Sequence, residues 1–404
     1  MSPSRSTEAK PASPDWLSIF QFGLGALGIA LAWMLALFLL VAGMLEAART
    51  GQPLFSALVD MVPVAGIFFI GLLLVPSTYY ALRRILGRAH RPFKISGRAF
   101  GLAIFLLPLL LAGGSWALAA NLGWLALLAH LMASLLLVTW LLWLALRGLQ
   151  PGSAQRAWGT FGSGLVASPI LAFILEGIGL IALIVFLAVY IQVNPALTGL
   201  MTSLENVTSA NPEVLLQELA PLFNDPLVLL IAFVSLSFFV PVIEELLKPL
   251  AVYLLLRRDL SEAQGFALGA LSGAGYALAE NLALNTQPES LFLVAVGRFG
   301  ASAMHIFTAA LSGYALVRAK NQKSIWPFLG ILALNIFIHG LWNGMVVLIT
   351  AASFTTAGAG SQVPVGSVIF ALPVMLIVAL ACIFFLQHMN RIFRTALHVK
   401  ISAQ

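Results

Sequence analysis

The chain has 404 residues, of which 60% are hydrophobic and only 9% are charged. A soluble fold cannot hide that much apolar surface, so the composition excludes a water-soluble globular protein. The formal net charge of +6 comes mainly from basic residues in short loops between long apolar runs, which argues against a nucleic-acid partner.

Ten apolar runs of about 20 residues or more follow a Ser- and Pro-rich start. Each is long enough to cross ~30 Å of hydrocarbon as a helix. They lie at 17–45, 56–82, 99–120, 123–146, 163–192, 227–256, 263–284, 291–317, 325–351 and 367–389. The first is too long for a cleaved signal peptide and is expected to be a retained signal anchor. The sequence therefore predicts an all-α, polytopic membrane helical bundle of about ten transmembrane helices in the cell membrane.

The runs and loops divide the chain into five parts. Residues 1–14 are predicted to be a disordered cytosolic tail. Residues 15–192 hold five spans of open role, and residues 193–226 form an extracytoplasmic loop in which "NPEVLLQELAPLF" predicts an amphipathic helix. Residues 227–351 hold four spans that carry most of the intramembrane polar residues. Residues 352–404 hold the last span and a cytosolic tail.

The orientation follows from Lys and Arg. With the N-terminus in the cytosol, 18 of the 21 basic residues fall in inside segments. Only Arg49 falls outside, and Lys248 and Arg298 lie within spans. This bias predicts an even number of spans with both termini cytosolic.

Charged and amide side chains inside the predicted spans are concentrated in the sixth to ninth runs. The first five runs contribute only Asp60, His130 and Glu176 as scattered candidates. The concentrated set is Glu244, Glu245, Lys248, Glu280, Asn281, Arg298, His305, Asn335, His339 and Asn343. Buried charge is costly in hydrocarbon and usually marks a protein interior or a functional cavity. At ~1.5 Å per residue, the acidic and histidine positions lie ~20–27 Å from the inner ends of their spans, so they can form one cluster.

Local spacing adds detail to this cluster. Lys248 follows Glu244 by four residues and Glu245 by three, so it can approach both carboxylates. One carboxylate can then be neutralised while the other acts as a base. Pro241 and Pro249 flank the group, and each removes a backbone hydrogen bond, so the helix can bend there. Glycines 265, 269 and 273 repeat every four residues and predict close packing of the seventh span on a neighbour.

Four motifs resemble those of PrsW-type intramembrane proteases, which belong to a superfamily with the CAAX prenyl proteases. They are "PVIEELLKP" (241–249), "GFALGALSGAGYALAEN" (265–281), "MHIFTAALSG" (304–313) and "HGLWN" (339–343). The resemblance covers about residues 227–350, with Tyr276 where Phe is more usual.

This resemblance implies a membrane-embedded peptidase of the glutamate type, without an obligatory metal or other cofactor. Glu244 or Glu245 would activate water, helped by His305 or His339. Lys248 would set the ionisation of the glutamate pair, and Glu280 would hold a histidine. Asn343 and a protonated histidine would stabilise the oxyanion. The implied substrate is a single-span membrane protein cut near the outer face of the bilayer.

Three other interpretations stay open. A metalloprotease would use Glu244, Glu280, His305 and His339 as ligands, although no His-Glu-x-x-His motif is present. A transporter or ion-pathway protein would use the buried charges as a relay, but its usual two related halves are absent. A non-catalytic scaffold of the same superfamily would grip substrate helices without cutting them.

Overall fold

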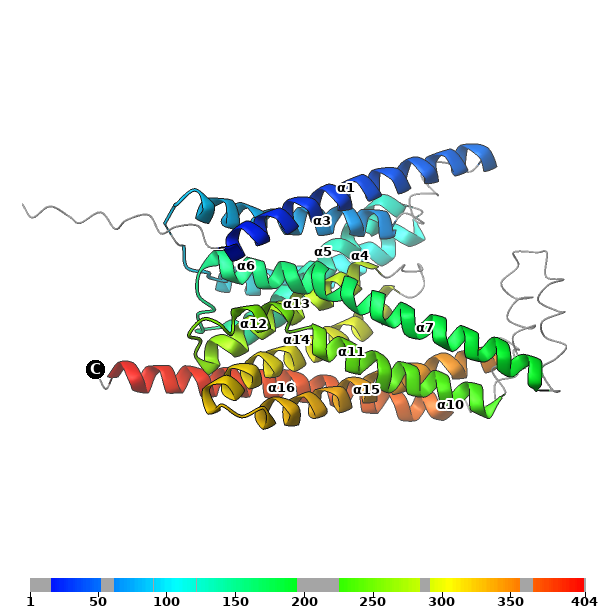
Figure 1. Cartoon of the computed structure of the whole chain (residues 1–404). Coiled ribbons are helices and arrows are strands. Elements are labelled where there is room, and N and C mark those ends of the chain that lie inside the picture. Colours follow the sequence, from blue (N-terminus) through cyan, green and yellow to red (C-terminus); the bar gives the residue numbers. More distant parts are fainter. Residues whose placement is uncertain are drawn as a thin grey trace, which may run out of the picture.

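The computed structural model of the chain describes residues 16–51, 62–89, 91–120, 122–194, 225–283, 291–356 and 366–402. Within these ranges the chain forms long helices and no strand. The helices lie side by side along one common direction, as Figure 1 shows. The predicted tail at 1–14 and the predicted amphipathic helix in the 193–226 loop lie outside the described residues.

The first half of the chain contributes five long helical segments. They are α1 (Trp16–Thr50), α3 (Val62–Ile85), α4 (Gly97–Ala119), α5 (Gly123–Leu146) and α6 (Ala154–Gly162) with η1 (Ser163–Ala167) and α7 (Ser168–Val193). The segment η1 is one π-helical turn that joins α6 to α7 without a break. Such turns insert an extra residue into a helix and often occur at functional sites.

The second half contributes the remaining helices. They are α10 (Pro226–Val234), η2 (Ser235–Phe239), α11 (Val240–Leu247), α12 (Leu250–Leu255), α13 (Glu262–Ala283), α14 (Leu291–Gln322), α15 (Trp326–Thr356) and α16 (Gly366–Ser402). Within the described part of the chain, nine helices are long and apolar enough to cross a membrane. This confirms the predicted all-α, multi-pass bundle.

The seventh predicted span, at 263–284, differs from the other nine in composition. It is α13, which has the length of a span but is rich in Gly, Ala and Ser. Nearly all of its residues from Gly265 to Leu282 are buried by neighbouring helices. Figure 1 shows α13 in the middle of the bundle, with α5 and α14 beside it. Because protein rather than lipid surrounds α13, it does not need an apolar exterior.

The glycine repeat of α13 brings this helix into backbone contact with α14, as predicted. A Cβ atom added at Gly265, Gly269 or Gly273 would collide with backbone carbonyl oxygens of α14. The opposite side of α13 is equally close to the π-helical turn η1, because a Cβ at Gly275 would meet the backbone of that turn. The small residues therefore fix the position of α13 between α14 and η1.

The sixth predicted span is irregular on both sides of the glutamate pair. The π-helical turn η2 precedes α11, and Pro241 is the second residue of α11. Pro249 ends α11, and α12 begins directly after it. The carbonyl of Lys248 receives a hydrogen bond from the Ser272 hydroxyl of α13 instead of a bond within the helix. The predicted disruption at the two prolines is thus present.

The start of α1 and the end of α16 lie at the same end of the bundle (Figure 1). This placement agrees with an even number of crossings. The assignment of that end to the cytosol stays a prediction from the Lys and Arg distribution.

Replacing Gly269 with Ala should destabilise the protein by roughly 1–3 kcal/mol, because the new methyl group overlaps the α14 backbone at Ala309 and Ala310. Thermal unfolding in detergent measures the effect. The matched control is Gly297→Ala on α14, where a Cβ meets no atom within 4 Å. An equal melting temperature for Gly269→Ala and the control would contradict the close α13–α14 contact.

Candidate active site

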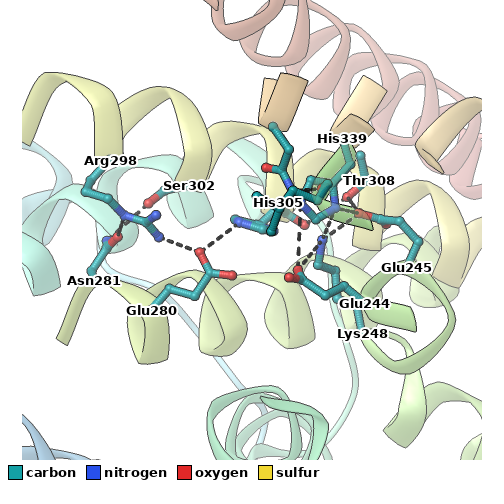
Figure 2. A network of polar contacts seen from close by, with 12 residues as sticks. Glu244, Glu245, Lys248, Glu280, Asn281, Arg298, Ser302, His305, Thr308 and His339 are labelled. Carbon is teal, nitrogen blue, oxygen red and sulfur yellow. Dashed lines mark hydrogen bonds and ion pairs between the residues drawn. The ribbon is translucent and has the colours of Figure 1, made fainter. Parts of the chain in front are cut away.

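The glutamate pair and its lysine are buried between α11, α13, α14 and α15. Glu244 is 7% exposed, and Glu245 and Lys248 are fully buried. The Lys248 ammonium lies 2.5 Å from Glu245 Oε1 and 3.5 Å from Glu244 Oε2. Lys248 therefore neutralises mainly Glu245 and only approaches Glu244. Figure 2 shows Lys248 lying between the two carboxylates. The spacing predicted contact with both carboxylates but not which of them is preferred.

One oxygen of Glu245 collects three donors from three helices. Its Oε1 accepts from Lys248 Nζ, from His339 Nδ1 at 2.9 Å and from Thr308 Oγ1 at 3.2 Å. Thr308 is in turn held by Asn335, whose Nδ2 donates to the Thr308 carbonyl at 2.8 Å. A buried carboxylate with several donors is far less costly than an isolated one. Glu245 therefore joins α11, α14 and α15 at a single point.

The contacts of His339 assign its tautomer. Nδ1 lies 2.9 Å from Glu245 Oε1 and 3.3 Å from Lys248 Nζ. A carboxylate only accepts and an ammonium only donates, so the shorter contact places the proton on Nδ1, donated to Glu245. In the neutral ring, Nε2 then carries a lone pair. That nitrogen lies 3.8 Å from Glu244 Oε2.

A second carboxylate holds His305 in the same way. His305 Nε2 lies 3.1 Å from Glu280 Oε2, and the same oxygen accepts from Arg298 at 2.6 Å. Arg298 also donates to Asn281 Oδ1 at 2.6 Å, and Asn281 donates to Ser302 Oγ at 3.1 Å. Figure 2 shows this chain of contacts leading from Arg298 through Glu280 to His305. The proton on Nε2 leaves Nδ1 of His305 with the lone pair.

Glu244, His305 and His339 converge at one buried point. One ligand atom from each of Glu244, His305 and His339 fits within 4.8 Å of the others. His305 Nδ1 and Glu244 Oε2 are buried and have no hydrogen-bond partner among the described residues. The two rings stand at 84° with centroids 5.2 Å apart. Three acceptor atoms facing one another repel unless a cation or a proton lies between them.

These residues fit a divalent metal ion. Two histidines and one glutamate are a common ligand set of zinc peptidases. In such sites each histidine usually donates its other N–H to a carboxylate, as His305 does to Glu280 and His339 does to Glu245. The metalloprotease interpretation of the sequence also uses Glu280 as a ligand. In the structure Glu280 lies outside the converging group and contacts His305 instead.

Asn343 is placed apart from the hydrogen-bonded cluster. It stands one turn after His339 on α15, and its Nδ2 donates to the Leu236 carbonyl of η2 at 3.0 Å. The hydrogen bond ties α15 to the π-helical turn that precedes the glutamate pair. Its predicted role at the oxyanion stays a prediction.

Three residues near the cluster have no role in the site predicted from the sequence. Thr308 binds Glu245, and it follows His305 by one helical turn, a spacing that would have indicated a shared face. Tyr276 lies with its ring 5.2 Å from Lys248 Nζ and 5.5 Å from the His305 ring. Glu176 of α7 has a buried Oε1 without a hydrogen-bond partner in the described chain. Its helix packs against α11, which carries the glutamate pair.

Replacing Lys248 with Met should destabilise the protein by about 3–5 kcal/mol, because Glu245 then lacks its buried counter-charge. The double variant Lys248→Met with Glu245→Gln should regain part of this loss, because it removes the uncompensated carboxylate. Melting temperatures in detergent measure both effects. If Lys248→Met unfolds at the wild-type temperature, the ion pair does not stabilise the fold.

The comparisons with known proteins agree with this geometry. Residues 158–381, more than half of the chain, match the family model described as "PrsW family intramembrane metalloprotease". No curated protein and no solved structure matches the chain. The match extends beyond the motif region at 227–350 and includes η1 and α7, so the helix that carries Glu176 lies within it. The chain therefore belongs to the PrsW family of intramembrane proteases.

Proposed function

We propose that the chain cleaves membrane proteins by a metal-dependent hydrolysis in which Glu244, His305 and His339 hold one divalent cation. The observation that supports this proposal most directly is the convergence of three buried acceptor atoms. Two of them, on Glu244 and His305, have no hydrogen-bond partner among the described residues. When bound, the cation supplies Lewis acidity toward the scissile carbonyl and the attacking water.

Neighbouring carboxylates fix which nitrogen of each histidine carries the proton. Glu245, itself paired with Lys248, keeps the proton of His339 on Nδ1. Glu280, itself paired with Arg298, keeps the proton of His305 on Nε2. Each imidazole therefore keeps one nitrogen with a lone pair for the cation. Such fixed geometry removes the need for reorganisation during the reaction.

Glu176 is our candidate for the group that accepts a proton from water. Glu245 and Glu280 are already hydrogen-bonded and paired with cations, and Glu244 is assigned to the metal. Glu176 lies on α7, which packs against α11, and its buried Oε1 has no hydrogen-bond partner among the described residues. The family resemblance of the motifs implies water activation by Glu244 or Glu245. This proposal moves that role to α7.

The proposed substrate is a single-span membrane protein cut near the outer face of the bilayer. The family supports a peptide substrate within the membrane. The sequence places the site ~20–27 Å from the predicted cytosolic ends of its helices, nearer the opposite face. A transporter or a non-catalytic scaffold has no need for a buried group of one glutamate and two histidines that could hold a metal ion, so neither is favoured by the site.

Glu244→Gln should abolish cleavage of a single-span substrate when enzyme and substrate are reconstituted together in liposomes. The amide keeps the size of the side chain but is a much poorer metal ligand. Gel analysis of the substrate measures cleavage, and Arg391→Gln, an exposed position on α16, is the matched control. Cleavage by Glu244→Gln at the wild-type rate would contradict the proposed site.

Glu176→Gln should lower kcat by about 10²- to 10⁴-fold, the usual contribution of a general base, while metal content stays at the wild-type level. Glu280→Gln should instead lower metal affinity by about 10- to 100-fold, because it weakens the support of a ligand. Metal analysis and cleavage assays on the same preparations separate these effects. If the Glu176→Gln enzyme is fully active, Glu176 is not the proton acceptor, and Glu244 or Glu245 becomes the candidate.

A further inference from the structure

A basic hollow lies at the end of the bundle where α3 stops and α6 starts. Its lining includes Arg83, Arg84, Arg88, Arg91, Ser153 and Gln155. The first two arginines are half-buried in the last turn of α3, and the other two are exposed on the segment that follows. Four arginines from one short stretch thus line a single hollow.

Within the described part of the chain, these four arginines have no acidic partner. The ion pairs of the described residues include none of the four. Residues 61–175 contain eight basic residues and not one Asp or Glu. Arg83 donates to the Tyr79 hydroxyl at 3.3 Å and lies over its ring, but that contact is neutral. The positive charge of the hollow is therefore uncompensated by this part of the protein.

The walls of the hollow are held in place by backbone contacts. Ala154 N donates to the Arg91 carbonyl at 2.7 Å, and Phe93 N donates to the Gly152 carbonyl at 3.2 Å. These bonds join the segment after α3 to the first residues of α6. Gln155 is fixed from the other side, because its amide donates to Ser18 and Gln21 of α1. The backbone at Arg91 and the side chain of Gln155 are therefore held in place beside the two arginines in the last turn of α3.

We propose that this hollow binds the phosphate group of an anionic membrane lipid. A guanidinium group donates two parallel hydrogen bonds to phosphate, and several together compensate a headgroup charge without a carboxylate. Basic pockets between transmembrane helices on the cytoplasmic side commonly bind such headgroups. The hollow lies at the end of the bundle that contains the start of α1 and the end of α16 (Figure 1). The sequence places that end at the cytosolic surface, where lipid phosphates lie.

The bound lipid would join the first two spans to the helices of the protease family. Gln21 of α1 donates to Ser77 of α3 and to the Gln155 carbonyl of α6, so three helices meet directly beside the arginines. The family match begins at residue 158, within α6. A phosphate at this junction would bind the arginine side chains of α3 and would also lie beside the first residues of α6.

Native mass spectrometry of the full chain with added lipid tests the proposal. Wild-type protein should retain phosphatidylglycerol in preference to phosphatidylcholine. The variant Arg84→Gln with Arg88→Gln should bind phosphatidylglycerol about thirty-fold more weakly, the loss expected for two arginines at an anionic surface. The control removes the same charge elsewhere near this end of the helices, by Arg257→Gln with Arg391→Gln, and should bind as the wild type does.

Three results would overturn the proposal. Unchanged phosphatidylglycerol binding by the Arg84 and Arg88 variant would show that the hollow is not the site. An equal loss of phosphatidylglycerol binding in the Arg257 and Arg391 control would show that the lipid binds through general surface charge. Displacement of the lipid by inorganic phosphate at equal concentration would assign the hollow to a free phosphate rather than a lipid.

Discussion

The burial of Lys248 beside Glu245 is the interaction on which the rest of the site depends. Two charges removed from water are strongly destabilising unless their remaining hydrogen-bonding groups are satisfied. Here the carboxylate gains Thr308 from α14 and His339 from α15. The pair thus aligns three helices and fixes the tautomer of His339. Glu280 with Arg298 repeats the same arrangement on the other side, and it fixes His305.

Close helix packing makes this arrangement possible. The cluster spans α11, α13, α14 and α15, so its short distances require these helices to approach one another tightly. A Cβ at Gly273 would meet the carbonyl oxygen of His305 itself, so the glycine repeat sets how closely α13 can bring Glu280 to that histidine. The π-helical turn and Pro249 then adjust the direction of α11 around the glutamate pair. Small residues and helix irregularities here serve the polar site.

Much of this architecture could be predicted from the sequence because it depends on patterns within one helix. Apolar runs indicated the ten long segments, and the spacing of Lys248 indicated its contact with both glutamates. The choice between Glu244 and Glu245 could not be predicted, because it depends on donors from α14 and α15. The same is true of the free nitrogens of His305 and His339, which follow from partners on other helices. Glu176 looked isolated in sequence because α7 reaches the cluster only through tertiary packing.

Metal content is the most direct measure of the central claim, which is that Glu244, His305 and His339 converge to bind one cation. Elemental analysis by mass spectrometry should find about one divalent metal ion per wild-type chain. The ion should be lost in a His305→Ala, His339→Ala double variant that keeps the wild-type fold. Cleavage should stop when a chelator removes the metal and should return when the metal is restored. A metal-free wild-type enzyme that cleaves its substrate at full rate in chelator would contradict the account.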